Sequence, residues 1–305
     1  MDKFSTNKND ILLLNKLFGN LDPSSLPARF KLGKKEYKGI GDDFSPTVRK
    51  RLVDSNICET VITGKNSKGI QVRAEIVEYR DFPVVEWQLF FENTSSRTSG
   101  ILSELNPIDF VFPGKKAVLQ HNNGDTTKSN CFERYETDIK KEATVLSPIN
   151  GVSCQGAFPY MRLCLEDYIV SIAIGWTGQW QASFSKESKG IRFIAGQQRF
   201  ASKIYAGETF CTPKITLMLT DTSDTSRAMN MWRRWYFAHI LPKEFGKSIS
   251  PKSCMHVFAY DGPEFTGATT ESQVNGLKQY VERGLKPDIW WFDAGWYKCD
   301  KEWTK

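Results

Sequence analysis

A lone carboxylate, Asp293, follows a short apolar and aromatic run near the end of the printed sequence. The run from Ile289 to Phe292 comes after Lys286-Pro287, a pair that disfavours helix, and its composition is typical of a buried strand. A carboxylate at the carboxyl end of such a strand is well placed to contact a ligand in an α/β fold. The sequence therefore predicts a polar ligand site at Asp293, although an Asp in a loop can equally cap a turn.

A complete strand–helix–strand unit is predicted around this carboxylate. A short apolar strand over 254–258 is followed by a polar loop and by Thr270, which with Gln273 resembles a helix-capping box. Gly284 is placed to end the helix, whose three apolar residues share one face: Val274, Leu277 and Val281. Two strands joined in this way are expected to run parallel, with a right-handed crossover between them.

Before residue 222 the sequence is dominated by strand patterns. Apolar and polar residues alternate over 70–76 and again over 85–91, which indicates two adjacent antiparallel strands. Residues 1–40 contain turn signals and are expected to add an edge strand or two. Further short strands are predicted at 109–112, 117–120, 168–174, 191–193 and 214–219. We therefore predict a large antiparallel β-sandwich of about 220 residues.

A helix is expected to follow the sandwich, over 221–239. It is predicted to start at a cap on Thr222 or Ser223, with Arg227 outside its buried stripe, which comprises Ala228, Met231, Trp232 and Trp235. Residues 243–252 are rich in Lys, Ser and Gly and are typical of a linker. The predicted domains are thus 1–242, with the helix at the end of the sandwich, and 253–305, joined by the linker 243–252.

Composition argues against several classes of function. The net charge of +6 is modest and the basic residues are scattered in short groups, so nucleic-acid binding is not predicted. The seven cysteines show no CxxC spacing, so neither a disulfide framework nor a structural zinc site is indicated. No stretch reaches the ~20 apolar residues of a membrane span. No signal peptide is recognisable, so we expect a cytoplasmic protein or one whose export signal has been removed.

Two tryptophans, Trp176 and Trp180, fall within six residues that also contain two glycines. One interpretation is an exposed aromatic platform, a surface suited to sugars. The other is a hairpin whose Trp side chains cover the sheet, which is the commoner use of aromatic residues in a large β fold. We favour the second interpretation at this stage.

Together, the predicted sandwich, helix and strand–helix–strand unit resemble the melibiase-type α-galactosidases of glycoside hydrolase family 36. The resemblance rests on motifs that follow one another in order: Pro83 to Trp87, Gly175 to Trp180, Ala206-Gly207-Glu208 with Thr212-Pro213, Asn230 to Arg234, and Lys286 to Tyr297. Each motif is weak alone, but together they span most of the chain.

The resemblance implies a galactose-mutarotase-like β-supersandwich, followed by the opening of a (β/α)₈ barrel that hydrolyses α-galactosides or related sugars with retention and without cofactor or metal. Asp293 matches the first Asp of a family motif that usually reads Asp-Asp-Gly-Trp, whose two Asp bind sugar hydroxyls, and Trp296 matches its Trp. Ala294 replaces the second Asp, so the sugar can differ from galactose. Tyr260 or Phe258, at the end of the first barrel strand, is expected to add an aromatic face.

No catalytic residue is assigned by the resemblance. Retaining glycosidases need two carboxyl groups about 5–5.5 Å apart, and in this family both lie on later barrel strands than the sequence contains. The chain is therefore expected to be the amino-terminal part of a hydrolase and to be inactive alone. Two alternatives stay open: a non-catalytic module that binds carbohydrate or assembles subunits through the sandwich, and a mutarotase-like enzyme that uses His121 with a Glu.

The predicted barrel strands would carry unpaired edges and uncovered apolar surface. We expect the residues after about 250 to pack on the sandwich, to pair with another chain in a homo-oligomer, or to be partly disordered.

Overall fold

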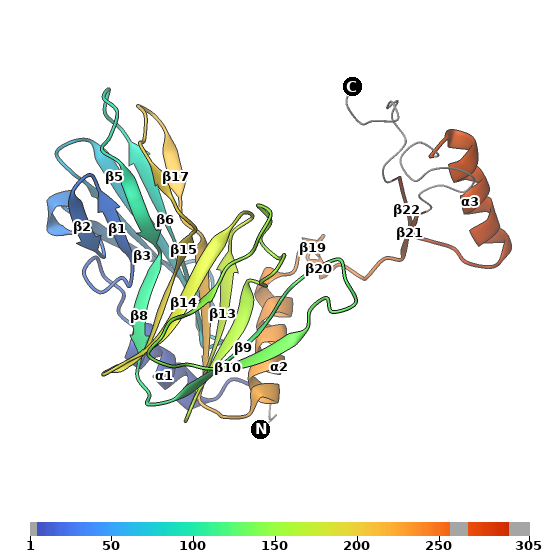
Figure 1. Ribbon diagram of the computed structural model, residues 1–305, viewed down its shortest axis with the longest axis horizontal. Coiled ribbons are helices and arrows are strands. Elements are labelled where there is room, and N and C mark those ends of the chain that lie inside the picture. Colours follow the sequence, from blue (N-terminus) through green and yellow to red (C-terminus); the bar gives the residue numbers. More distant parts are fainter. Residues whose placement is uncertain (1–4, 257–267, 293–305) are drawn as a thin grey trace. The chain divides into compact units, whose positions relative to one another are not determined.

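The computed structural model describes residues 5–256 and 268–292 of the chain (Figure 1). It divides into two compact units, Met1–Ala238 and His239–Lys305. The prediction had set the end of the sandwich domain at residue 242. The first unit contains nearly all of the strands, and the second contains the strand–helix–strand segment.

A large antiparallel sheet forms one layer of the first unit (Figure 1). Its strands in spatial order are β10 (Arg134–Asp138), β9 (Ala117–Asn122), β12 (Tyr160–Leu165), β13 (Ile169–Gly175), β18 (Lys214–Thr220), β6 (Val84–Asn93), β5 (Ile70–Tyr79), β4 (Ile57–Lys65) and β3 (Thr47–Leu52), with β17 (Thr209–Cys211) also paired to β6. Strands β5 and β6 pair from Tyr79 with Val84 to Ile70 with Asn93, as the alternation predicted. The predicted inward residues, such as Val72 and Trp87, are indeed buried.

Two smaller antiparallel sheets complete the sandwich. One contains β11 (Thr144–Leu146), β14 (Trp180–Glu187), β15 (Gly190–Gln197) and β8 (Ile108–Phe112), and the other contains β16 (Ala201–Ser202), β7 (Leu102–Asn106), β1 (Arg29–Leu32) and β2 (Lys35–Lys38). One hydrophobic cluster joins all three sheets, with Phe30, Trp87 and Phe193 among its members. A short 3-10 helix, η1 (Asp42–Phe44), adds Phe44 to the same core.

An amino-terminal helix, α1 (Lys8–Phe18), was not predicted from the sequence. Asn7 and Asp10 form a capping box at its start, in which each side chain accepts a hydrogen bond from the other residue's amide. Its apolar face enters the core of the sandwich, where the ring centroid of Phe18 lies 4.7 Å from that of Phe110. The helix therefore belongs to the sandwich and is held there by burial of its apolar face.

The helix that ends the sandwich, α2 (Thr225–Trp235), forms where it was predicted and continues into a π-helical turn, η2 (Tyr236–Ile240). Its cap is Asp224, whose carboxylate accepts hydrogen bonds from the amides of Ser226 and Arg227, and not Thr222 or Ser223. Placing Arg227 outside the buried stripe was wrong, because the residue is only 8% exposed.

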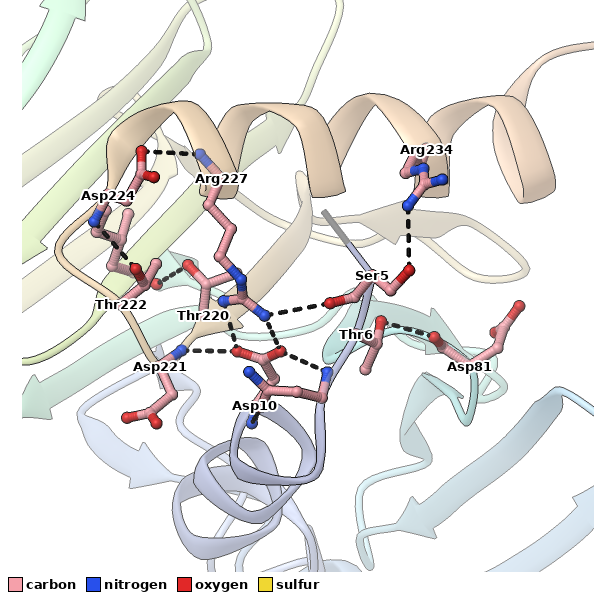
Figure 2. A network of polar contacts seen from close by, with 12 residues as sticks. Ser5, Thr6, Asp10, Asp81, Thr220, Asp221, Thr222, Asp224, Arg227 and Arg234 are labelled. Carbon is pink, nitrogen blue, oxygen red and sulfur yellow. Dashed lines mark hydrogen bonds and ion pairs between the residues drawn. The ribbon is translucent and has the colours of Figure 1, made fainter. Parts of the chain in front are cut away.

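A buried ion pair explains the position of Arg227 (Figure 2). Its Nη1 donates to Asp10 Oδ1 at 3.0 Å, and its Nη2 donates to Asp10 Oδ2 at 2.5 Å. Asp10 also accepts a hydrogen bond from the amide of Asp221 and is fully buried. The pair joins α1 to the start of α2, and the hydrogen bonds that Arg227 donates to Asp10 raise the pKa of Arg227.

The second unit contains a short hairpin of β19 (Lys243–Glu244) and β20 (Lys247–Ser248) within the segment predicted as a linker. It then contains β21 (Cys254–His256), α3 (Thr270–Glu282) and β22 (Ile289–Trp291). None of the helices in the described ranges is long and apolar enough to cross a membrane.

Candidate functional site

The residues predicted to bind sugar in the second unit are Phe258, Tyr260, Asp293 and Trp296, and all four lie outside the described residues. The described part of this unit includes the strand that precedes each pair of them in sequence, β21 before Phe258 and Tyr260 and β22 before Asp293 and Trp296. Strands β21 and β22 are parallel, with Met255 opposite Trp290, as the sequence predicted. Helix α3 connects the two strands, so the chain forms a βαβ unit.

Asp288 ties together the amino-terminal ends of the two parallel strands. Its Oδ2 accepts hydrogen bonds from the amide of Ser253 at 2.8 Å and from the Ser253 hydroxyl at 3.0 Å. Its own amide donates to the Ser253 carbonyl at 3.0 Å. The hydrogen bonds from Ser253 lower the pKa of Asp288. These contacts give Asp288 a structural role. Asp288 precedes β22 in the sequence, whereas Asp293 follows it.

Trp290 on β22 contacts two residues of α3. Its indole Nε1 donates to Gln273 Oε1 at 3.0 Å, and its ring meets that of Tyr280 edge-on at 5.7 Å. Because side chains alternate along a strand, Ile289 and Trp291 point away from α3, and they are 44% and 56% exposed. The described unit therefore has a polar and aromatic contact on one face of β22 and an uncovered apolar face on the other.

Trp176 and Trp180 do not form an exposed platform. Trp180 is fully buried in the sandwich core, and its Nε1 donates to the Ser153 carbonyl at 2.9 Å. Trp176 is half-buried and packs against the same core. Burial of Trp180 does not fit the platform interpretation and agrees with a packing role. The predicted hairpin is not formed, because β13 and β14 belong to different sheets.

The first unit contains a pocket of about 450 Å³ that the sequence did not predict. It lies at the β10 end of the ten-stranded sheet, on the face opposite the core, which we term the outer face. Helix α2 contributes Thr225, Met229 and Trp232 to its wall. The sheet contributes polar and aromatic side chains, which include Gln120, Arg134, Glu136, Phe158, Tyr160, Arg162 and Ser171.

A row of polar side chains crosses four strands beneath this pocket. The strand registers place Glu136 opposite Gln120, Gln120 opposite Arg162, and Arg162 opposite Ser171. Gln120 Nε2 donates to Glu136 Oε1 at 2.7 Å, while Gln120 Oε1 accepts from Arg162 Nε at 3.1 Å. Neighbouring residues on the same strands, such as Leu119, lie in the core, so the row faces outward.

The two positively charged side chains of the pocket lack ion-pair partners in the described part of the chain. Within the described residues, neither Arg134 nor Arg162 forms an ion pair with a carboxylate. Burial lowers the pKa of Arg162, and repulsion from Arg134 adds to that effect although the Cys164 thiol opposes it. Burial and a hydrogen bond with Tyr236 raise the pKa of Tyr160, so its hydroxyl stays protonated at neutral pH.

His121 and Glu136 both line the pocket, but no contact joins their side chains within the described residues. The ring of His121 stacks on Tyr135 at 5.5 Å, and its Nε2 contacts the Thr137 hydroxyl at 3.1 Å. Burial lowers the pKa of His121, which favours the neutral imidazole. Glu136 is bonded to Gln120 and His121 to Thr137, so the described structure shows no direct His–Glu pair of the kind that a mutarotase-like mechanism uses, and that alternative stays a prediction.

The described residues contain no group of three or more His, Cys, Asp or Glu side chains that could hold a metal ion. The six described cysteines are all free, and Cys58 is the one that is buried.

Solved structures of family 36 α-galactosidases share this fold. A variant of α-galactosidase AgaA from Geobacillus stearothermophilus, solved with stachyose, superposes with a TM-score of 0.66 at 16% identity. The match covers 89% of this chain and 40% of that one. This chain has the fold of the amino-terminal region of family 36 α-galactosidases.

Two further α-galactosidase structures have the same fold. The galactosidase domain of AgaSK, an α-galactosidase–sucrose kinase, gives a TM-score of 0.65 at 16% identity over 89% of this chain and 39% of its own. The α-galactosidase from Lactobacillus brevis gives 0.65 at 12% identity, over 85% of this chain and 37% of its own. The chain thus spans about 40% of the length of the α-galactosidases it matches. Neither a protein-family model nor a curated protein sequence matches it.

Proposed function

We propose that this chain is the amino-terminal part of a retaining α-galactosidase-like glycoside hydrolase. The observation that carries the proposal is a parallel βαβ unit, β21–α3–β22, that follows a sandwich of the family 36 fold in the same chain. In this proposal the unit opens a (β/α)₈ barrel, and later barrel strands supply the nucleophile and the acid/base.

The exposed apolar side chains of the second unit support an unfinished barrel. On β22, Ile289 and Trp291 face away from α3, which is the side that faces the interior of a (β/α)₈ barrel. On α3, Val274 and Val281 are 45% and 47% exposed, although they form the apolar stripe of the helix. Neighbouring strands and helices of a barrel would bury both sets of side chains, which would contribute about 25 cal/mol for each Å² of apolar surface removed from water.

We propose that Asp293 accepts hydrogen bonds from sugar hydroxyls at the mouth of this barrel. A strand that continued past Trp291 with the same alternation would direct residue 293 to the face opposite α3. Trp296 would provide an apolar wall, and Tyr260 or Phe258 a further aromatic face. Because Ala294 stands where the family motif has a second Asp, the preferred sugar can differ from galactose at the hydroxyl that this Asp would bind.

Activity measurements on two lengths of the protein test this proposal. The 305-residue chain and a chain extended through the rest of the coding region are assayed on p-nitrophenyl α-galactoside and on the corresponding α-glucoside. We expect turnover only by the extended chain. Turnover by the 305-residue chain itself would refute the placement of the catalytic carboxylates on later strands.

A pair of charge-neutralising variants in the extended chain separates the roles of the two carboxylates near β22. Asp293→Asn is expected to lower kcat/KM by about 10- to 100-fold, because hydrogen bonds to a charged group contribute about 1.5–3 kcal/mol. Asp288→Asn is the matched control: it removes the same charge at the other end of the strand and should change kcat/KM by less than about threefold. Equal losses in the two variants would argue against a sugar contact by Asp293.

A further inference from the structure

The outer-face pocket of the sandwich lies apart in sequence from the proposed barrel site and shares none of its residues. Its volume of about 450 Å³ falls within the range of small-molecule sites, about 300–1,000 Å³. The ligand of this pocket is therefore set by the residues of the sandwich and not by those of the proposed barrel site.

The positive charge in the pocket indicates an anionic group on the ligand. Arg162 is half-buried, and its guanidinium Nε is its one hydrogen-bonded nitrogen within the described residues, bonded to Gln120. Neither Arg162 nor Arg134 forms an ion pair with a carboxylate within the described residues, although Glu136 also lines the pocket, and the two guanidinium groups repel each other. Burying a cation without a counter-ion is costly, so a site of this kind gains most from an anion that both guanidinium groups can contact.

The hydrogen bonds around Arg162 hold its guanidinium in a fixed direction. Glu136 accepts from Gln120, and Gln120 in turn accepts from Arg162 Nε, so the row orients the planar group through one edge. The terminal Nη1 and Nη2 atoms are then available for a bidentate contact with a carboxylate or phosphate, the pairing that arginine geometry favours.

A second polar group in the pocket also lacks a partner. The Ser171 hydroxyl follows Arg162 in the cross-strand row, and Ser171 is 4% exposed. Its Oγ makes no hydrogen bond within the described structure. A buried hydroxyl without a partner costs about 1–3 kcal/mol, so a ligand oxygen that reached it would recover this loss.

The remaining wall of the pocket is aromatic. Tyr160 and Trp232 meet edge-on with ring centroids 6.1 Å apart, and the ring of Phe158 lies 5.3 Å from that of Tyr160. Tyr and Trp combine a flat apolar face with a polar tip, which suits a ring that carries both C–H and hydroxyl groups. An inorganic anion would leave these walls without a contact.

We propose that this pocket binds a monosaccharide that bears a carboxylate or a phosphate group. The oxyanion contacts Arg162 and Arg134, and the sugar ring lies against Trp232 and Tyr160. The ligand chemistry shared by a sugar acid and a sugar phosphate is an oxyanion on a polyhydroxylated ring, and the measurements below distinguish the two sources. A neutral sugar would leave both guanidinium groups without an ion-pair partner and is expected to bind more weakly.

Calorimetric titration of the 305-residue chain at low ionic strength tests the proposal. The probes are galacturonate, galactose 6-phosphate, galactose and inorganic phosphate. At least one of the two charged sugars is expected to bind about tenfold or more tightly than galactose and than inorganic phosphate, with affinity that falls as salt is added. The charged sugar that binds more tightly identifies the source. Equal affinity for galactose and both charged sugars, or no binding of any probe, would overturn the proposal.

Four variants assign the binding to the pocket. Arg162→Met, which keeps most of the apolar stem, should weaken the charged sugar by about tenfold or more, and Arg134→Gln, at an exposed position, by about threefold. Trp232→Leu should weaken the charged sugar without changing the salt dependence. The matched control is Arg49→Met, which removes a positive charge from the exposed strand β3. If Arg49→Met weakens binding as much as Arg134→Gln, the attraction is a property of the net charge and the pocket assignment fails.

Discussion

The two units of the chain differ in how far they bury apolar side chains. In the sandwich, Trp87 and Phe193 are 1% and 0% exposed. In the βαβ unit, Trp291 and Val281 are 56% and 47% exposed, although both belong to regular elements. The sandwich thus closes its core with its own strands, whereas the described βαβ unit leaves part of its apolar surface in water.

Polar contacts differ between the units in the same way. The sandwich buries the ion pair of Asp10 and Arg227, so its loss would leave a charge without water or a partner. The βαβ unit joins its strands through Asp288 and Ser253 at exposed positions, where water can replace either group. The sandwich is thus stabilised by its own interior. The βαβ unit keeps exposed apolar surface on which further strands and helices could pack.

The largest expected effect is the loss of the buried ion pair of the sandwich. Arg227→Met leaves the fully buried carboxylate of Asp10 without its cation, and breaking one side of such a pair costs about 3–5 kcal/mol. We expect the free energy of unfolding of the sandwich to fall by that amount in urea titrations followed by far-ultraviolet circular dichroism.

An exposed ion pair of the same unit provides the control for this measurement. Lys31→Met removes the cation from Glu104, whose side chain is 50% exposed, and should change the unfolding free energy by less than about 1 kcal/mol. Similar losses in the two variants would contradict the contrast between buried and exposed polar pairs.

A smaller effect is expected from the aromatic contact that holds the βαβ unit together. Trp290→Ala removes both the hydrogen bond to Gln273 and the ring contact with Tyr280. We expect a loss of about 3 kcal/mol, at the lower end of the range for aromatic truncation, because Trp290 is half-buried. Hydrogen exchange of the amides of Thr270–Glu282 measures this loss of stability, since those amides report on the second unit alone.

The neighbouring tryptophan is the matched variant. Trp291→Ser shortens a side chain that points away from α3, so it should leave amide protection within about 0.5 kcal/mol and reduce self-association of the chain. Equal loss of protection in the two variants would mean that both faces of β22 are packed, and the contrast between the units would disappear.

Much of the sandwich could be predicted because its strands carry a local signal. Alternation over 70–76 and 85–91 reports burial directly, and the structure pairs these runs as expected. Helix α1 was missed because its signal is short: an Asn at the cap, an Asp three residues later and four apolar residues in sequence, with no extended helical stripe. Its stability comes from the core that it enters, which no local pattern records.

The pocket was missed because its residues come together only through the order of the strands. Glu136, Gln120 and Arg162 lie on three adjacent strands that are not ordered by sequence, and the helix that adds Trp232 is further along the chain. Arg227 was misplaced for the same reason, since its partner Asp10 is 217 residues away. The βαβ unit, in contrast, was predictable from residues that are close in sequence.

The smallest of the expected effects concerns acid stability. Asp109 accepts hydrogen bonds from Arg192 Nε and Nη2, each at 2.7 Å, and from Arg29 at 3.3 Å, so it ties together β8, β15 and β1. Burial favours the neutral acid, but the contacts with Arg192 and Arg29 outweigh it and lower the pKa of Asp109. A carboxyl group whose pKa is depressed by folding stabilises the protein above the pKa of the unfolded chain, about 3.9, and this contribution is lost as the pH falls through the folded pKa.

Asp109→Asn is therefore expected to destabilise the sandwich by about 2 kcal/mol at pH 7, and the difference from the unaltered chain should shrink below about pH 4. Urea titrations at a series of pH values measure both quantities. Asp288→Asn in the βαβ unit is the matched control: the pKa of Asp288 is also lowered, by hydrogen bonds from Ser253, but the group is exposed. Its substitution should leave the acid dependence of the sandwich unchanged. An Asp109→Asn penalty that stays constant down to pH 2 would show that lost packing, and not the charge on Asp109, accounts for the difference.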